Sequence, residues 1–238
     1  MQNRTAADFI TALQLHQSDV EKEKLQRYFK TGEGEYGAGD VFMGIRMGEL
    51  FKIAAAFMTM PLDEVELLLD SPIHEIRAGA LSIMDKKGRS KKTTEPERKA
   101  MFELYLRRLD RINNWDLVDV SCQYVIGRYL EDKPRDILYE LAQSDDMWAR
   151  RTAIVSTAYF LRNKQPDDTF AIAAILVNDR EDLIHKAVGG WLRQAGKTDK
   201  TRLKRFLDVY AAAMPGTMLR YATEHFDIAE KEYYRQLK

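Results

Sequence analysis

Trp115 and Asp119 are the two residues whose types and spacing most clearly suggest chemistry. Residues four apart on a helix share one face, so an indole and a carboxylate would lie side by side. The indole face attracts positive charge, and a carboxylate stabilises a developing cation. The pair therefore suits a substrate with a cationic ring. The same spacing also fits a core tryptophan beside a helix-surface aspartate, and it does not separate these two interpretations.

Arg150 and Arg151 follow Trp148 at the start of a predicted helix. Guanidinium groups bind phosphate oxygens through two parallel hydrogen bonds, so the pair is a candidate phosphate contact. A solvated helix face or salt bridges between neighbouring helices would explain the pair equally well.

Metal and cysteine chemistry find no support in the sequence. His16, His74, His185 and His225 lie far apart, and none belongs to a recognisable metal motif. Cys122 is the only cysteine, which excludes an internal disulfide, and without a histidine partner it reads as a small buried residue. We expect neither a metal nor a cofactor.

The elements that must position these residues are helices. The chain has only 13 glycines and 6 prolines, the residues that interrupt helices. Apolar residues recur with helical spacing along most of the chain, and no segment shows the alternating pattern of a strand. The pattern predicts an all-α protein of about a dozen short helices. The first runs over 8–29 with one break, and another covers 116–129. The glycine cluster 32–39 predicts a turn with positive φ at several positions.

The helices also repeat. A charged residue followed by small or apolar residues recurs along the chain at five positions: Arg77, Asp119, Arg151, Lys186 and Arg220. Most of the intervals are close to 35 residues, which is typical of HEAT-like helix–turn–helix units. Such units bury their apolar faces only by stacking, so the sequence predicts a curved α-solenoid whose concave face carries this charge ladder.

Four of these five repeated positions are cationic, and the remaining one, Asp119, is anionic. A cationic concave groove suits a polyanion such as DNA. A carboxylate at its centre opposes phosphate binding, which makes Asp119 a candidate for chemistry. Alternatively, the five residues are solvated, with Asp119 paired to a neighbouring arginine.

Length and composition set the frame. The 238 residues are 45% apolar and 31% charged, which fits a globular chain, predicted as one domain over 1–238. Within it we expect a helical cap at 1–45 and stacked repeats at 46–238. With 37 basic and 37 acidic side chains, net charge points to no partner. The absence of a signal-like stretch, of a bilayer-spanning run and of cysteine pairs leads us to expect a cytoplasmic monomer without a membrane partner.

Several segments, in order over nearly the whole chain, resemble the DNA alkylation repair enzyme family, the AlkD-type DNA glycosylases. The resemblance is carried by Asn114-Trp-Asp-Leu-Val-Asp119, Trp148-Ala-Arg-Arg-Thr-Ala-Ile154, Lys186-Ala-Val-Gly-Gly-Trp-Leu-Arg193, Glu75-Ile-Arg-Ala-Gly-Ala-Leu81, Arg27-Tyr-Phe-Lys30 and Phe42-Met-Gly-Ile45. The tryptophan–aspartate spacing together with the downstream arginine motif is the most specific part.

The resemblance implies a HEAT-like solenoid that holds duplex DNA carrying alkylated bases. It implies metal-free hydrolysis of the N-glycosidic bond of cationic purines alkylated at N3 or N7. By the same resemblance, Asp119 corresponds to the catalytic carboxylate and Trp115 to an aromatic residue beside the lesion. Arg151 corresponds to a DNA-contacting residue, and Tyr28 to an aromatic residue of the cleft.

One position departs from the family pattern. A second cleft tryptophan is expected where this chain has Gly190, and Trp191 follows one residue later. One residue turns a helix position by about 100°. The second aromatic wall of the site is therefore the part of the pattern that this sequence changes, although Trp191 remains a candidate DNA contact.

The sequence thus leads to a DNA glycosylase for cationic alkylpurines. Two other hypotheses remain open: a non-catalytic protein that binds distorted or branched DNA through the same groove without needing Asp119, and a helical scaffold for a protein partner.

Overall fold

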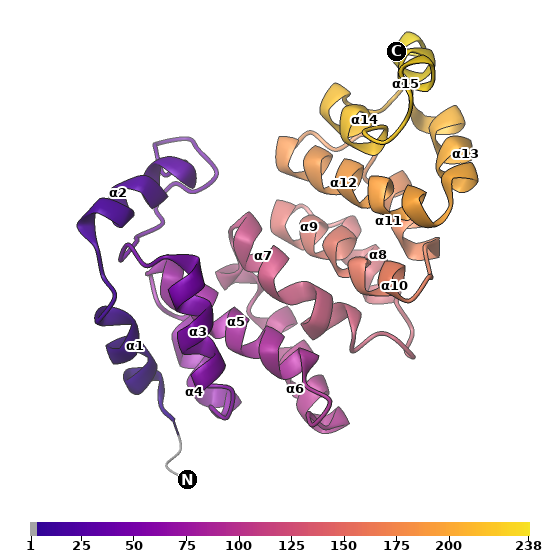
Figure 1. Ribbon diagram of the computed structural model, residues 1–238. Helices are drawn as coiled ribbons and strands as arrows, with labels where there is room; N and C mark the ends of the chain where they lie inside the picture. The colour runs from indigo at the N-terminus through magenta and orange to yellow at the C-terminus, as the bar shows by residue number, and fades with distance from the viewer. Residues whose placement is uncertain (1–3) are drawn as a thin grey trace. The chain divides into compact units, whose positions relative to one another are not determined.

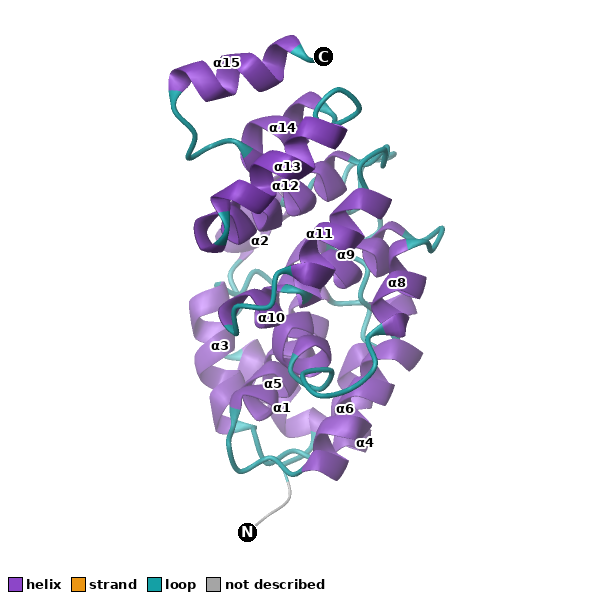
Figure 2. Ribbon diagram, turned by 90° about the vertical axis from the view of Figure 1, so that its right-hand side faces the viewer, coloured by secondary structure: helices purple, strands orange, loops and turns teal. Residues whose placement is uncertain are grey.

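The computed structural model describes residues 4–238, and these residues form helices joined by turns and loops (Figures 1 and 2). The predicted all-α class is confirmed. Within the described range no strand forms, and an isolated bridge between Val41 and Ile73 is the β-type pairing present. The chain divides into two compact units, the first ending at Ile126 and the second covering Gly127–Lys238. Of the cap predicted at 1–45, residues 1–3 lie outside the described residues.

The first unit is organised around a long, almost wholly buried helix, α5. This helix packs against α3, α4 and α7, and α1 packs against α3 and α4 (Figure 1). The helices of this unit are α1 (Ala6–Gln14), α2 (Asp19–Tyr28), α3 (Met47–Ala56), α4 (Leu62–Leu69), α5 (His74–Arg89), α6 (Glu95–Arg107), a 3-10 turn (Leu109–Arg111) and α7 (Trp115–Cys122).

The second unit is organised around α12, which packs against α9, α11, α13 and α14. A π-helical turn, Gln123–Gly127, follows α7 directly, and its last residue is the first of this unit. Its helices are α8 (Asp136–Ala142), α9 (Met147–Ser156), α10 (Ala158–Arg162), α11 (Asp167–Ile175), α12 (Asp182–Thr198), α13 (Lys200–Tyr210), α14 (Gly216–Ala222) and α15 (Ile228–Gln236).

Each unit contains a row of helices packed side by side: α3, α5 and α7 in the first, and α9, α12 and α14 in the second. Such stacking of non-consecutive helices is typical of a helical-repeat fold, in which each unit buries its apolar face against the next. The five ladder positions lie on these row helices. Arg77 is on α5, Asp119 on α7, Arg151 on α9, Lys186 on α12 and Arg220 on α14.

Local sequence explains where the first helices begin. Thr5 and Asp8 form a capping box at α1, and the Ser18 side chain caps α2, which places the predicted break at 15–18. The glycine segment then turns the chain with positive φ at Gly34 and Gly39, as predicted. Gly44 also has positive φ, and a Cβ atom there would lie 2.0 Å from the Ser18 carbonyl oxygen. This close approach fixes the segment before α3 against α2.

The single cysteine is buried, as predicted. Among residues 4–238, no three acidic, histidine or cysteine side chains gather as metal ligands would. None of the described helices has the length and apolarity needed to cross a bilayer.

Candidate functional site

Helix α7 carries both residues of the candidate chemistry, in the relative placement that their spacing predicts. Trp115 is its first residue, and the Asn114 side-chain oxygen accepts a hydrogen bond from the Trp115 amide at 2.8 Å. Asp119 follows one turn later. Both side chains are half-buried. The carboxylate is therefore neither sealed in the core nor fully solvated, and a partly dry environment strengthens its effect on nearby positive charge.

An aromatic cluster, formed by Tyr28, Phe29, Phe42 and Trp115, lies beside the start of α7. Trp115 stacks on Phe29 with ring centres 5.5 Å apart, and Phe29 stacks on Phe42 at 5.3 Å. Tyr28 meets the Trp115 ring edge-on at 5.8 Å and is 64% exposed. The structure thus brings the predicted Tyr28 and Trp115 together, supported by two phenylalanines that the sequence did not single out.

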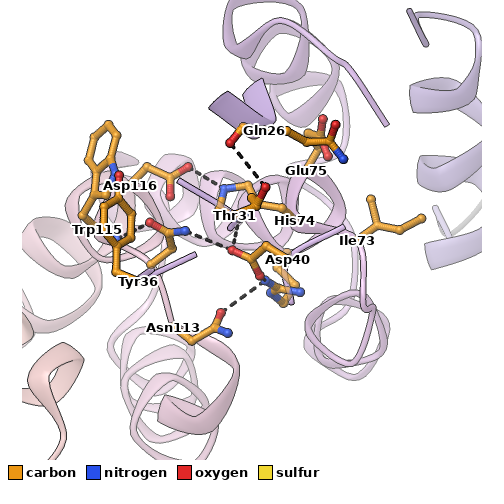
Figure 3. Close-up of polar contacts among 12 residues, drawn as sticks. Gln26, Thr31, Tyr36, Asp40, Ile73, His74, Glu75, Asn113, Trp115 and Asp116 are labelled. Atoms are coloured by element: carbon orange, nitrogen blue, oxygen red, sulfur yellow. Dashed lines mark hydrogen bonds and ion pairs between the residues drawn. The ribbon is translucent and has the colours of Figure 1, made fainter. Parts of the chain in front are cut away.

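Beneath this cluster lies an ion-pair network centred on His74 (Figure 3). The His74 Nε2 atom lies 2.8 Å from Asp116 Oδ2, and its Nδ1 atom lies 3.3 Å from Asp40 Oδ2. Burial alone would lower the pKa of His74. The charge and hydrogen bond of Asp116, together with those of Asp40, outweigh burial and raise the pKa of His74 to about 9. His74 is thus a buried cation at neutral pH.

Asp40 joins this network to Arg77 and to the cap of α7. It accepts hydrogen bonds from Arg77 at 2.6 Å and from the Asn114 amide at 2.9 Å. Burial would raise the pKa of Asp40, but the hydrogen bonds from His74 and Asn114 and the charges of His74 and Arg77 lower it to about 2. The carboxylate therefore stays ionised and ties the loop before α3 to both α5 and α7.

Arg77, predicted as a DNA contact of the ladder, is only 3% exposed. Besides Asp40, its guanidinium donates to the Ser71 carbonyl oxygen at 3.0 Å and to the Asn113 side chain at 3.2 Å. These hydrogen bonds use both terminal nitrogens of the guanidinium, while its Nε atom is buried without a hydrogen-bond partner in the described part of the chain. Reaching a phosphate would break buried charge-assisted hydrogen bonds, so Arg77 holds parts of the protein together.

Glu75 holds the chain next to this network. Its carboxylate accepts hydrogen bonds from three consecutive backbone amides, those of Met43, Gly44 and Ile45, at 3.0, 2.8 and 3.2 Å. The residue is 1% exposed. The segment that leads from the aromatic cluster into α3 is therefore anchored on α5 by a buried anion.

In the second unit, the arginine pair begins α9 as expected, but both side chains make internal contacts. Arg150 pairs with Asp179 at 2.6 Å and also donates to the carbonyl oxygens of Ser144 and Asp145. Arg151 is 7% exposed and donates to the Leu183 carbonyl oxygen at 2.7 Å. Both arginines thus help to join the start of α9 to the segments around it.

Lys186 and Arg220 remain exposed. Lys186 pairs with Asp182 on its own helix at 2.6 Å, and the Arg220 guanidinium lies 4.9 Å from the centre of the Tyr221 ring. Contacts of this kind are weak at a surface, so both cations can turn to a phosphate at little cost.

Gly190 and Trp191 occupy different faces of α12. Gly190 lies one turn after the exposed Lys186, and a Cβ atom at Gly190 would meet nothing within 4 Å. Trp191 is half-buried and lies one turn from the buried residues Ala187 and Ala195. The position where the family pattern has its tryptophan is therefore open, and the indole of this chain sits on the more buried flank.

Sequence reasoning missed the network of Asp40, His74 and Asp116. His74 was considered only as a metal ligand, and it lies 34 residues from Asp40 and 42 from Asp116. The one local signal was Asp116 itself, an acidic residue at the second position of α7.

Taken together, the fold and the site define an all-helical repeat protein with a half-buried carboxylate one turn from an aromatic cluster. The sequence profile of the DNA alkylation repair enzymes matches residues 9–226, so the chain belongs to this family. No curated protein matches it. Among solved structures, it is similar to a predicted DNA alkylation repair enzyme from Enterococcus faecalis, with 18% identity and a TM-score of 0.69 over 91% of this chain and 99% of the other. At that identity the likeness supports the fold alone.

Proposed function

We propose that this protein is a DNA glycosylase of base excision repair, which hydrolyses the N-glycosidic bond of cationic purines alkylated at N3 or N7 in duplex DNA. Membership of the family places the chain in DNA alkylation repair. The reaction type and the lesion are inferred from the chemistry of the site.

The observation that carries the proposal is the placement of Asp119 one helical turn from Trp115 on α7, with both side chains half-buried. Alkylation at N3 or N7 gives the purine a positive charge and makes it a good leaving group without protonation. The protein then has to stabilise positive charge on the sugar and orient a water molecule. A partly desolvated carboxylate can do both.

The aromatic cluster supports this chemistry. The faces of Trp115 and Tyr28 attract a cationic base, an effect on the order of 1–2 kcal/mol where water is excluded. Because Tyr28 is mostly exposed and Trp115 rests on Phe29, the cluster presents aromatic surface on a buried support. Lys186 and Arg220 supply exposed cations for backbone phosphates, which fix position on the duplex without reading its sequence.

The test is release of free bases from a methylated duplex. We expect the wild-type protein to release 7-methylguanine and 3-methyladenine without added metal, and the Asp119→Asn variant to lose release while its affinity for the same duplex stays within about twofold. Asp116→Asn is not a suitable control, since it breaks a buried ion pair. Asp110→Asn is suitable, because Asp110 is exposed on the neighbouring 3-10 turn. Release by Asp119→Asn at the wild-type rate would refute the catalytic assignment.

A non-catalytic function in binding distorted or branched DNA is the second candidate. One observation favours it: the chain has Gly190, with open space around it, where the family pattern has its second tryptophan. Under this hypothesis no base is released, and a branched duplex binds more tightly than a methylated linear one. The base-release assay, together with a competition between the two duplexes for binding, separates the hypotheses.

A further inference from the structure

A hollow of about 350 Å³ lies between α14 and α15 in the second unit, and of the candidate residues discussed above Arg220 is the one that lines it. Figure 2 shows α15 running across this end of the unit, next to α14. The residues that line the hollow are Gly216, Leu219, Arg220, Thr223, Glu224, Lys231, Arg235 and Lys238. We refer to it as the C-terminal basic pocket.

The charges around this pocket are unbalanced. Lys231, Arg235 and Lys238 are spaced so that they share one face of α15 and its end, and Arg220 of α14 joins them in the lining. Glu224 is the one acidic residue that lines the pocket, and it pairs with Arg193 on α12. Four cations thus converge on a hollow whose single carboxylate is already engaged.

The acidic residues of α15 pair with one of these cations, Arg235, but with neither lysine. Glu230 pairs with Lys200 and Lys204 of α13 at 2.8 and 2.7 Å. Glu232 pairs with Arg235 at 3.2 Å, and both of these side chains are exposed. Within residues 4–238, neither Lys231 nor Lys238 has an ion pair. Like charges gathered in this way repel one another, and a bound anion would relieve that repulsion.

The arrangement is also held in place. Tyr234, which lies one helical turn from both Lys231 and Lys238, is buried and donates a hydrogen bond to Asp208 of α13 at 3.0 Å. This contact fixes α15 against α13, so the helix that carries Lys231 and leads to Lys238 is held in position. The Lys238 Nζ atom lies 3.8 Å from the place where a Cβ atom on Gly216 would be, so the ammonium group lies close to the start of α14. The four cations line the pocket from two helices whose positions are set by packing.

We propose that the C-terminal basic pocket binds a phosphate group. The choice of a duplex-backbone phosphate as its source rests on the proposed function, whereas the pocket itself does not. Two lysines and two arginines around a pocket without aromatic walls suit a phosphate and offer nothing to stack on a base. Through this contact the protein grips DNA outside the site of base release.

The test compares two double variants that remove the same charge. Lys231→Gln/Lys238→Gln changes the pocket, and Arg180→Gln/Arg205→Gln changes exposed cations elsewhere in the same unit. Affinity for an unmodified 16-base-pair duplex is measured by fluorescence anisotropy over a range of KCl concentrations. Binding of inorganic phosphate is measured by calorimetry at constant ionic strength, and circular dichroism verifies folding.

We expect the pocket variant to bind the duplex roughly tenfold more weakly at 0.1 M salt, with a slope of log affinity against log salt that is smaller by about 2. The control variant should keep a slope close to that of wild type. Loss of phosphate binding with unchanged duplex affinity would support the pocket with free phosphate as its ligand. Wild-type behaviour of the pocket variant in both assays, or an equal loss in the control, would overturn the proposal.

Base release is measured separately, so the two proposals fail independently. If the wild-type protein releases no base but its duplex affinity depends on Lys231 and Lys238, the glycosylase proposal is refuted and the pocket stands. If it releases bases and the pocket variant binds both probes normally, the pocket proposal alone is refuted.

Discussion

His74 of α5 and Asp116 of α7 form a buried ion pair, with 2.8 Å between Nε2 and Oδ2. Asp116 directly follows Trp115 in the first turn of α7. The ion pair therefore fixes the end of the helix that carries Trp115 against α5. The other oxygen of Asp116, Oδ1, is buried and has no hydrogen-bond partner among the described residues. The attachment of this carboxylate to the protein therefore depends on the charge of His74.

The first prediction concerns stability at alkaline pH. The pKa of His74 is raised from 6.5 to about 9, so the ion pair contributes fully below pH 6.5 and its contribution disappears as pH rises through 9. We expect the free energy of unfolding to fall by up to about 3 kcal/mol across this interval, at about 1.4 kcal/mol per pKa unit. Urea titrations at pH 6.5 and 9.5 measure it.

The His74→Gln variant should be less stable at pH 6.5 and should lack most of this pH dependence. His225→Gln is the control, because His225 is exposed. If wild type and His74→Gln lose stability equally between the two pH values, His74 is not the group that titrates.

The second prediction concerns the anchor of the segment before α3. Glu75→Gln keeps the size of the side chain but replaces one acceptor oxygen by an NH₂ group that faces backbone donors. We expect a loss of about 2–4 kcal/mol, because charge-assisted hydrogen bonds to buried amides are removed. The free energy of unfolding in urea measures the loss, with the exposed Glu33→Gln as the matched control. A difference below about 0.5 kcal/mol between the two variants would contradict the anchoring role.

The third prediction contrasts two helical glycines. A Cβ atom on Gly79 would lie 2.4 Å from the ring of Phe9, which is fully buried, whereas Gly190 has open space around it. Gly79→Ala should destabilise the protein by about 1–3 kcal/mol through overpacking. Gly190→Ala should stabilise it by about 0.5–1 kcal/mol, because alanine loses less entropy in a helix. The melting temperature of each variant is compared with that of wild type. A change of the same sign in both variants would contradict the packing argument.

The fourth prediction tests the aromatic cluster. Trp115→Phe keeps a ring that can rest on Phe29 but weakens the attraction for a cationic base. Release of 7-methylguanine should slow by roughly tenfold, which corresponds to about 1.4 kcal/mol. The control is Trp148→Phe, since Trp148 is a buried tryptophan of the second unit. An unchanged single-turnover rate in Trp115→Phe would exclude the indole from the chemistry.

Local sequence was sufficient to predict the helices and several of their ends. Helical periodicity and capping act over a few residues, so the break before α2 and the turn at the glycine segment could be predicted. The proximity of Trp115 and Asp119 followed from the same period. The charged positions that recur about every 35 residues all lie on helices of the two rows. They could be predicted because each repeat has to present an equivalent face to its neighbour.

The partners of the charged residues depend on long-range packing. The sequence left it open whether Arg77 and Arg150 contact phosphate or are otherwise engaged. Their carboxylate partners are 37 and 29 residues away, and only folding brings each pair together. The network around His74 was hidden for the same reason.

The sequence by itself determined the helical class, the family and the adjacency of an indole and a carboxylate on one helix face, because these depend on spacing within a few turns. Only the tertiary structure decided which charged side chains are buried in ion pairs and hydrogen bonds, and which remain exposed and able to contact DNA. The physical reason is that desolvation and ion pairing depend on neighbours that are distant along the chain, and those neighbours become defined only when the helices pack.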